Sequence, residues 1–136
     1  GRADFLFCAE GNVSLLGGYG RDWLEGGKRS DLMNGGAGND VIFANSGEDQ
    51  MIGGRGRDKF TFADGTLGGL IQDWEDGKDW LDFTRADNVN ALSDLTIEQT
   101  SNKSVTITFE NDNGREVDVD LFSNRAFTLT DGDFLI

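Results

Sequence analysis

The fold of this chain is decided by the stretch GGYGRDWLE-GGKRSDLMN-GGAGNDVIF-ANSGEDQMI-GGRGRDKFT, residues 17–61, in which five nine-residue blocks follow one another without a gap. The sixth position of every block is an aspartate and the eighth position is apolar. The aspartates are Asp22, Asp31, Asp40, Asp49 and Asp58, and the apolar residues are Leu24, Met33, Ile42, Met51 and Phe60. The stretch is therefore one repeat with an acidic column and an apolar column.

The spacing within a block predicts its local structure. Glycine at positions one, two and four allows backbone conformations with φ > 0, so the first six residues are expected to form a tight loop and the last three a short strand. A three-residue strand with one inward side chain is not stable alone, so the blocks must stack. We predict a parallel β-roll with two blocks per turn, in which residues eighteen apart lie side by side at about 4.8 Å.

Stacking brings like charges together, because Asp22, Asp40 and Asp58 would line one edge of the roll and Asp31 and Asp49 the other. Two carboxylates about 5 Å apart repel by roughly 1 kcal/mol in bulk water, and by more at lower dielectric. A divalent cation between them would remove the repulsion. Calcium takes six or more oxygen ligands, which loop carbonyls and carboxylates supply, whereas zinc is disfavoured by the absence of histidine and the single cysteine. A metal-free turn repeat is the alternative, but it does not explain an acid at one fixed position.

The blocks resemble the RTX (repeats-in-toxin, hemolysin-type) nonapeptide G-G-x-G-x-D-x-U-x, a calcium-binding repeat. In that family each ion takes carbonyls of positions two and four and the Asp of one loop, with carbonyls of positions one and three and the Asp of the loop one turn later. The resemblance implies three calcium sites. Their ligands would be Gly18, Gly20, Asp22, Gly35, Ala37 and Asp40 for the first; Gly27, Arg29, Asp31, Ala44, Ser46 and Asp49 for the second; and Gly36, Gly38, Asp40, Gly53, Arg55 and Asp58 for the third.

The second site departs from the family pattern. Arg29 stands where the motif has glycine, and Ala44 with Asn45 replaces a Gly-Gly pair. Non-glycine residues reach the required loop geometry only with some strain.

The repeat also extends toward the N-terminus. Read backwards, the frame places Asp4 at position six and Leu6 at position eight, and the block CAEGNVSLL has Val13 in place of the aspartate. We expect the chain to be part of a longer protein whose repeat begins before residue 1. A partial calcium site is expected between these first residues and the next turn, formed by Arg2, Asp4, Gly17, Tyr19 and Asp22.

Positions seven and nine of alternate blocks should point outward on one side of the roll. They are too apolar for a fully solvated surface, so we expect another segment to cover them. The residues are Phe5, Phe7, Trp23, Glu25, Val41, Phe43, Lys59 and Thr61.

The covering segment should come from residues 62–136, which we separate from a repeat domain at 1–61. Residues 70–83, LIQDWEDGKDWLDF, resemble the segment that closes the repeats of serralysin-type secreted proteases, so this segment is expected to cap the roll. Asp73, Asp79 or Asp82 would then join Asp49 or Asp58 in a last calcium site, or else serve as ordinary turn and strand acids.

Further along, apolar residues alternate with polar ones around residues 95–97, 105–109 and 117–121, a pattern typical of half-buried antiparallel strands. Asn113-Gly114 is a hairpin turn signal between the last two. The predicted fold class is all-β: a right-handed parallel β-roll followed by a C-terminal antiparallel β cap.

The composition argues against several classes of function. The 136 residues carry a net charge of −13, contain no histidine, and have no apolar stretch long enough to span a membrane and no N-terminal signal. The single Cys8 is expected to be a small buried residue. No paired nucleophile or phosphate loop is present, so we expect no catalysis from this chain and no nucleic-acid partner.

The chain ends in DGDFLI, residues 131–136, an acid followed by a short apolar tail. In RTX proteins such an ending belongs to the uncleaved signal for type I secretion, although an apolar tripeptide can also simply dock on a sheet. The expected function is a module that binds calcium and folds after export from a Gram-negative bacterium. Its partners would be calcium, the secretion apparatus and an upstream domain of the same polypeptide.

A second hypothesis starts from basic residues in and beside the loops. Residues 1–61 have a net charge of only −2, with nine acids and seven bases, so three calcium ions would make the roll cationic. Such a surface attracts an anionic polysaccharide, as accessory modules of some alginate-modifying enzymes do; otherwise the bases only aid solubility. The residues are Arg21, Lys28, Arg29, Arg55, Arg57 and Lys59.

Overall fold

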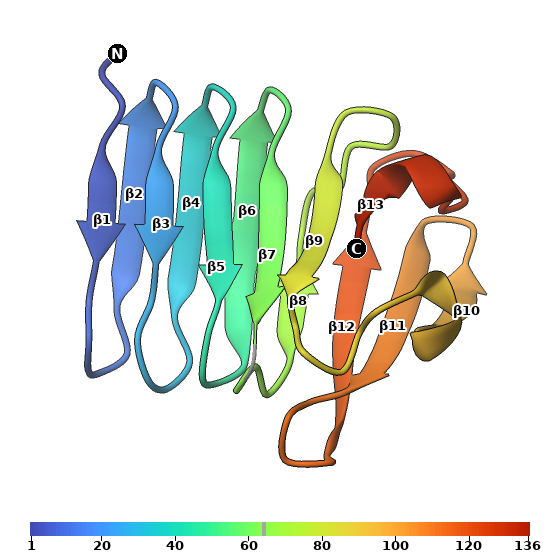
Figure 1. Ribbon diagram of the computed structural model, residues 1–136. Helices are drawn as coiled ribbons and strands as arrows, with labels where there is room; N and C mark the ends of the chain where they lie inside the picture. The colour runs from blue at the N-terminus through green and yellow to red at the C-terminus, as the bar shows by residue number, and fades with distance from the viewer. Residues whose placement is uncertain (64) are drawn as a thin grey trace.

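A computed structural model describes residues 1–63 and 65–136 (Figure 1). Its regular secondary structure is almost entirely β-strand. The strands are β1 (Phe5–Phe7), β2 (Ser14–Tyr19), β3 (Trp23–Glu25), β4 (Leu32–Ala37), β5 (Val41–Ala44), β6 (Asp49–Arg55), β7 (Lys59–Ala63), β8 (Gly69–Ile71), β9 (Trp80–Arg85), β10 (Thr96–Ser101), β11 (Ser104–Glu110), β12 (Glu116–Phe122) and β13 (Phe134–Leu135). Two short 3₁₀ helices lie at Leu92–Asp94 and Asp131–Asp133. No helix of the described residues is long and apolar enough to cross a membrane.

The repeats form the predicted parallel β-roll, with two facing sheets that the chain visits in turn. One sheet has the order β1-β3-β5-β7-β9-β13 and the other β10-β11-β12-β8-β6-β4-β2. Leu24 pairs with Ile42 and Ile42 with Phe60, which confirms the predicted eighteen-residue register. In Figure 1 strands β1 to β7 alternate in direction from one layer to the other, and their loops gather at two edges.

The apolar column forms the core between the two sheets. All five position-eight residues from Leu24 to Phe60 are fully buried, and Leu6 and Leu15 continue the column as partly buried residues. Each residue covers the equivalent residue of the next turn. The short strands therefore gain stability from stacking and not from their own length.

One sheet differs from the prediction of six-residue loops and three-residue strands. Strands β2, β4 and β6 run through the Gly-Gly pair that opens the next block, so they reach six or seven residues. Glycine makes this close stacking feasible: Gly36 has φ +100°, and a Cβ added there would collide with the Gly18 carbonyl one turn away.

Both sheets continue past residue 61, where the sequence pattern changes. Met51 of β6 pairs with Ile71 of β8, and Phe60 of β7 pairs with Leu81 of β9. Segment 70–83, predicted as a cap, thus contributes strands to one more turn of the roll. The offsets in this turn are 20 and 21 residues in place of 18, so a fixed nine-residue frame does not find it.

Antiparallel strands β10, β11 and β12 lie where alternating segments were expected, and they extend the second sheet through parallel pairing of β12 with β8. The half-buried pattern is present in β11 and β12, whereas β10 is exposed throughout. The β11–β12 hairpin turns at Asn113-Gly114, where only Gly114 takes positive φ, at +75°. The backbone N–H of Asn111 donates to the Arg115 carbonyl at 2.9 Å, so the turn has three residues between paired ends. The terminal Phe134 and Leu135 pair with β9. The apolar tail therefore docks on the sheet, which is one of the two interpretations of this ending given above.

The outward face of the first sheet is covered over only part of its length. Val41, Phe43 and Thr61 are buried, and the Arg85 guanidinium lies 4.9 Å from the Phe43 ring centroid. Phe5 and Phe7 remain 66% and 56% exposed. The expectation of a covering segment is therefore correct for the part of the face near β9. It is wrong at the β1 end, because residues 62–136 do not extend that far.

Candidate calcium sites

The aspartate column is held by a repeated backbone hydrogen bond. The N–H of Asp22 donates to Oδ1 of Asp40 at 2.7 Å, and the N–H of Asp40 donates to Oδ1 of Asp58 at 2.9 Å. The other edge repeats the arrangement, with Asp31 N–H donating to Asp49 Oδ1 at 3.0 Å. Each carboxylate is thereby fixed by the loop one turn before it, as the predicted stacking requires.

The second oxygen of each carboxylate has no such partner. Asp22, Asp31, Asp40, Asp49 and Asp58 are between 0% and 3% exposed, and each buries an Oδ2 without a hydrogen bond. The ion pairs among the described residues are Lys59–Asp82 and Lys78–Glu75, and neither reaches the column. A buried carboxylate oxygen without a hydrogen-bond partner disfavours the folded state. A cation bound beside it would compensate for the missing partner.

The glycines of position one leave space beside these oxygens. A Cβ added at Gly17 would lie 2.6 Å from Asp22 Oδ2 and 2.5 Å from the Gly35 carbonyl oxygen of the next turn. A Cβ on Gly35 would likewise meet Asp40 Oδ2, and would lie 2.8 Å from the Gly53 carbonyl oxygen. A carboxylate of one loop and a carbonyl of the next therefore converge on one small space, as the first and third predicted sites require.

The second predicted site is less complete. Arg29 takes φ +77°, the conformation that the motif assigns to glycine, so the loop keeps its shape at the cost of some strain. The Ala44 carbonyl, a predicted ligand, accepts a 2.7 Å hydrogen bond from the Thr66 hydroxyl. Asn45 fills the place of the second glycine and donates to Glu25 and to the Gly26 carbonyl. Asp31 and Asp49 are brought together, but one carbonyl of the set is already engaged.

The structure separates the three acids that were alternatives for a last site. Asp58 N–H donates to Asp79 Oδ1 at 3.0 Å, so Asp79 continues the Asp22–Asp40–Asp58 column after 21 residues. Asp73 instead accepts from the N–H groups of Gly53 and Gly54 with its two oxygens. Asp82 lies 3.5 Å from the Lys59 ammonium and is outside the column.

The sequence did contain a signal for Asp79. Asp79-Trp80-Leu81 repeats the acid-x-apolar order of Asp58-Lys59-Phe60, but the longer loop before it shifts the frame. The N-terminal partial site has related geometry: Asp4 N–H donates to Asp22 Oδ1 at 2.8 Å, and the Arg2 carbonyl stacks under Gly20.

Burial raises the pKa of several column members. Desolvation is the main cause, and the charge of the preceding column member adds to it, while the backbone N–H bond opposes it. The pKa of Asp49 is raised to about 7, that of Asp58 to about 6 and that of Asp79 to about 7. These carboxylates resist ionisation in the folded roll unless a cation neutralises them.

Side chains alone do not assemble a metal cluster. Among residues 1–63 and 65–136 no three His, Cys, Asp or Glu side chains converge to hold an ion. Backbone carbonyls would have to supply most ligands, which agrees with calcium's preference for many oxygens at relaxed geometry.

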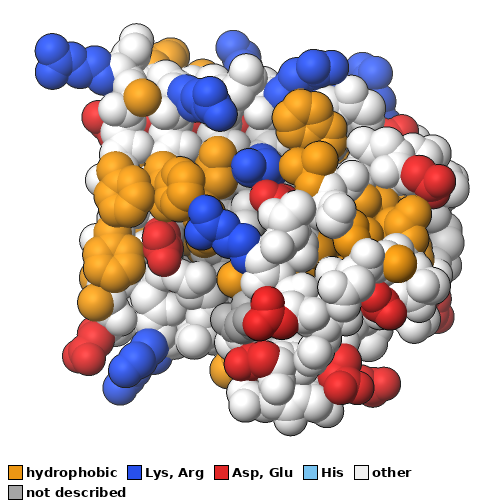
Figure 2. Space-filling model, in the orientation of Figure 1, with side chains coloured by type: hydrophobic (Ala, Val, Ile, Leu, Met, Phe, Trp, Pro, Cys, Tyr) orange, Lys and Arg blue, Asp and Glu red, His pale blue; other side chains and the backbone are white. Residues whose placement is uncertain are grey.

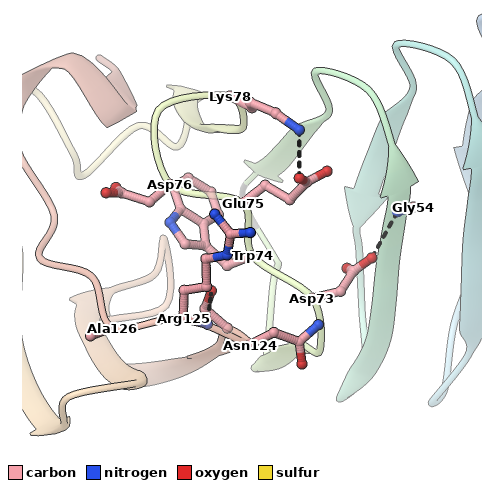
Figure 3. A pocket seen from close by; sticks show the side chains of 10 residues that line it. Gly54, Asp73, Trp74, Glu75, Asp76, Lys78, Asn124, Arg125 and Ala126 are labelled. Carbon is pink, nitrogen blue, oxygen red and sulfur yellow. Dashed lines mark hydrogen bonds and ion pairs between the residues drawn. The ribbon is translucent and has the colours of Figure 1, made fainter.

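A hollow of about 670 Å³ lies next to the end of the column (Figure 3). Its lining includes Trp74, Asp76, Ser123 and Arg125. Two lining carboxylates already have partners: Asp73 accepts a hydrogen bond from the Gly54 N–H, and Glu75 forms an ion pair with Lys78.

The comparisons with known proteins agree with this geometry. Residues 1–28 and 25–60 match the family model of the RTX calcium-binding nonapeptide repeat. Residues 1–60 thus consist of RTX repeats, and repeats of this kind bind calcium. A comparison with curated protein sequences gives no match.

Two solved structures share the fold of nearly the whole chain. The R3 subunit of the AlgE6 mannuronan C5-epimerase of Azotobacter vinelandii is 22% identical, with a TM-score of 0.60 over 98% of this chain and 78% of that one. The R2 subunit of the same epimerase is 23% identical, with a TM-score of 0.66 over 96% and 91%. At this identity the likeness concerns the fold, which is the all-β parallel roll described above.

Proposed function

We propose that this chain is a calcium-driven folding module of a larger secreted protein. The observation that carries the proposal is the set of five buried Asp Oδ2 atoms without hydrogen-bond partners. Without calcium, burying them opposes folding and the glycine-rich loops are entropically costly to order. With calcium the same oxygens become ligands, so metal binding and folding are one process.

Three complete sites are proposed, with the ligand sets that the family resemblance implies. The first and third are supported by the convergence of Asp22 with Gly35 and of Asp40 with Gly53. The second keeps Asp31 and Asp49, but its Ala44 carbonyl already accepts a hydrogen bond from the Thr66 hydroxyl, so it should be the weakest. A further site between Asp58 and Asp79 is supported by their shared hydrogen bond.

Calcium binding and folding are thermodynamically linked, and this linkage makes folding depend on the calcium concentration. A site at one hundred times its dissociation constant adds about 2.7 kcal/mol to folding, and several sites add accordingly. Extracellular calcium modules bind at about 10⁻⁴ to 10⁻³ M, so such a chain stays unfolded inside a cell and folds outside. Type I export from a Gram-negative bacterium, with residues 131–136 in the signal, is part of the proposal and is supported by the RTX repeats. The upstream domain would carry any catalysis.

A calcium titration followed by calorimetry and far-ultraviolet circular dichroism tests this proposal. The number of ions bound should be three or four, and strand signal should appear over the same calcium range as the heat. Binding of calcium to a chain whose strand content is already complete would contradict folding as its function.

Binding of an anionic polysaccharide is a second candidate function, and the charge distribution favours it. Lys and Arg side chains gather along the edge formed by the ends of β2, β4 and β6 and the loops after them (Figure 2), where Arg21, Arg55 and Arg57 lie. The fold is shared with subunits of an enzyme that modifies mannuronan. Calorimetry with alginate in calcium and in chelator tests it, with calcium gelation of the polymer controlled. No heat at low salt would exclude it.

A further inference from the structure

A shallow hollow on the same edge joins basic residues to a calcium ligand. It measures about 250 Å³, and its lining includes Arg21, Asn39, Asp40, Arg57, Lys59 and Trp80. Arg21, Asn39 and Arg57 come from three successive turns at the same block position, and Trp80 comes from β9. The hollow therefore exists only when the roll and its last turn are assembled.

The charges of the hollow favour an anion. Arg21 and Arg57 are exposed, and neither is in an ion pair among the described residues. They are two turns apart, which at the strand spacing places their backbones about 10 Å from each other. The Asn39 side-chain oxygen accepts the Arg57 N–H at 2.9 Å and fixes the loop that carries this arginine. Two cations so spaced can hold successive acidic groups of a polymer.

Trp80 adds a feature that simple counter-ion binding does not need. Its side chain is 37% exposed, although it lies beside the core on β9, and the Arg57 guanidinium is 5.8 Å from its ring centroid. An exposed indole next to arginine offers apolar contact for the C–H face of a sugar ring while the guanidinium takes its acidic group.

Asp40 connects the hollow to the calcium sites. It is the one acid among the residues that line the hollow, its buried Oδ2 has no hydrogen-bond partner, and it belongs to both the first and the third proposed sites. As an ionised group it repels an anionic ligand, and as a calcium ligand it is neutralised. Calcium binding should therefore strengthen ligand binding, and by reciprocity the ligand should strengthen calcium binding by the same factor.

We infer that this hollow is a binding site for acidic sugar units whose affinity is coupled to calcium through Asp40. The inference rests on the proposed polysaccharide function and assigns that function to a place and a mechanism. Carboxylated and sulfated sugars share the required chemistry.

The experiment compares variants of the calcium-loaded chain by calorimetry with a short oligomannuronate, which is too short to gel, and with a sulfated oligosaccharide of similar length. R21Q/R57Q and Trp80→Ala remove the features of the hollow. K103Q/R115Q removes the same charge from exposed surfaces outside the proposed binding face and is the matched control. Circular dichroism confirms that each variant still folds with calcium.

The hollow variants should bind at least one oligosaccharide about tenfold more weakly, as expected for loss of charge-assisted contacts, while K103Q/R115Q stays within about twofold of the unmodified chain. The oligosaccharide that loses more affinity identifies the acidic group. Calcium affinity should rise in the presence of the oligosaccharide for the unmodified chain and not for R21Q/R57Q.

Two outcomes overturn the inference, and they are distinguishable. If the unmodified chain binds but all variants bind equally well, the hollow is not the site and the polysaccharide function stands. If the unmodified chain binds neither oligosaccharide, the polysaccharide function fails and the inference fails with it, while calcium-driven folding is untouched.

Discussion

The backbone N–H of Asp40 donates a 2.9 Å hydrogen bond to Oδ1 of Asp58, eighteen residues later in the chain. This bond leaves Asp58 Oδ2 buried and without a partner, directly beside the space kept open by Gly53. The same relationship recurs along both edges of the roll. Folding this chain therefore requires that a row of carboxylates be buried close together, and calcium is the component that makes this favourable.

Asp40→Ala should impair calcium-induced folding more than Asp31→Ala. Asp40 belongs to the first and third proposed sites, whereas Asp31 belongs only to the second, where Ala44 is already engaged. We expect the calcium midpoint to rise about tenfold or more for Asp40→Ala, since one or two carboxylate ligands are lost. Matched titrations by circular dichroism provide the measurement, and an equal or reversed ranking argues against the eighteen-residue stacking as the basis of the sites.

Asp79→Ala should lower the number of calcium ions bound, and Asp82→Ala should leave that number unchanged. Asp79 accepts the Asp58 N–H in the column, whereas the buried Asp82 lies outside it, where it pairs with Lys59 and accepts hydrogen bonds from Thr84. Loss of Asp82 lowers stability but removes no proposed calcium ligand. Calorimetric ion counts on the two variants test the assignment, which is wrong if Asp79→Ala binds as many ions as the unmodified chain.

Gly35→Ala tests the space proposed for calcium without introducing strain at a positive φ. Gly35 does not take positive φ, but a Cβ there would meet Asp40 Oδ2 and the Gly53 carbonyl, so calcium binding should weaken strongly. Gly11→Ala is the control, because Gly11 has φ +93° with nothing within 4 Å of an added Cβ. That control should cost only about 1 kcal/mol of stability. Similar calcium midpoints for the two variants would show that the space beside Asp40 does not hold the ion.

Without calcium, acidification should promote folding. The pKa values of Asp49, Asp58 and Asp79 are about 7, 6 and 7 in the folded roll, against an ordinary value of 3.8, so folding takes up protons between these limits. Stability is therefore present at low pH and is lost as pH rises through 6 to 7. Circular dichroism in calcium-depleted buffer should show more strand at pH 5 than at pH 8. Equal or lower strand content at pH 5 contradicts this prediction.

Much of the roll was predictable because its information is local and periodic. The apolar column from Leu24 to Phe60, the register of eighteen and the alternation in β11 and β12 follow from spacing. The extension of β2, β4 and β6 through the Gly-Gly pairs was not predictable. Glycine is uncommon inside strands, so its presence did not indicate that these backbones stack closely.

The C-terminal boundary of the sites was harder to predict from sequence. Asp79 joins the column after an irregular loop, and the spacing of 21 residues depends on how segment 70–79 folds over Gly53 and Gly54. The Thr66 hydroxyl reaches Ala44 across 22 residues, a contact for which the sequence offers no pattern. Likewise, Arg85 of β9 lies against Phe43, whereas Phe5 is on β1 at the far end of the same sheet, a separation that the composition of the face does not encode.

The central claim is that calcium and the buried aspartates fold together. Thermal unfolding of the chain, followed by circular dichroism with chelator and then at increasing calcium at neutral pH, tests it most directly. The account predicts no cooperative transition in chelator, and a transition whose midpoint rises steadily with calcium concentration. An identical cooperative transition in chelator and in calcium would contradict it.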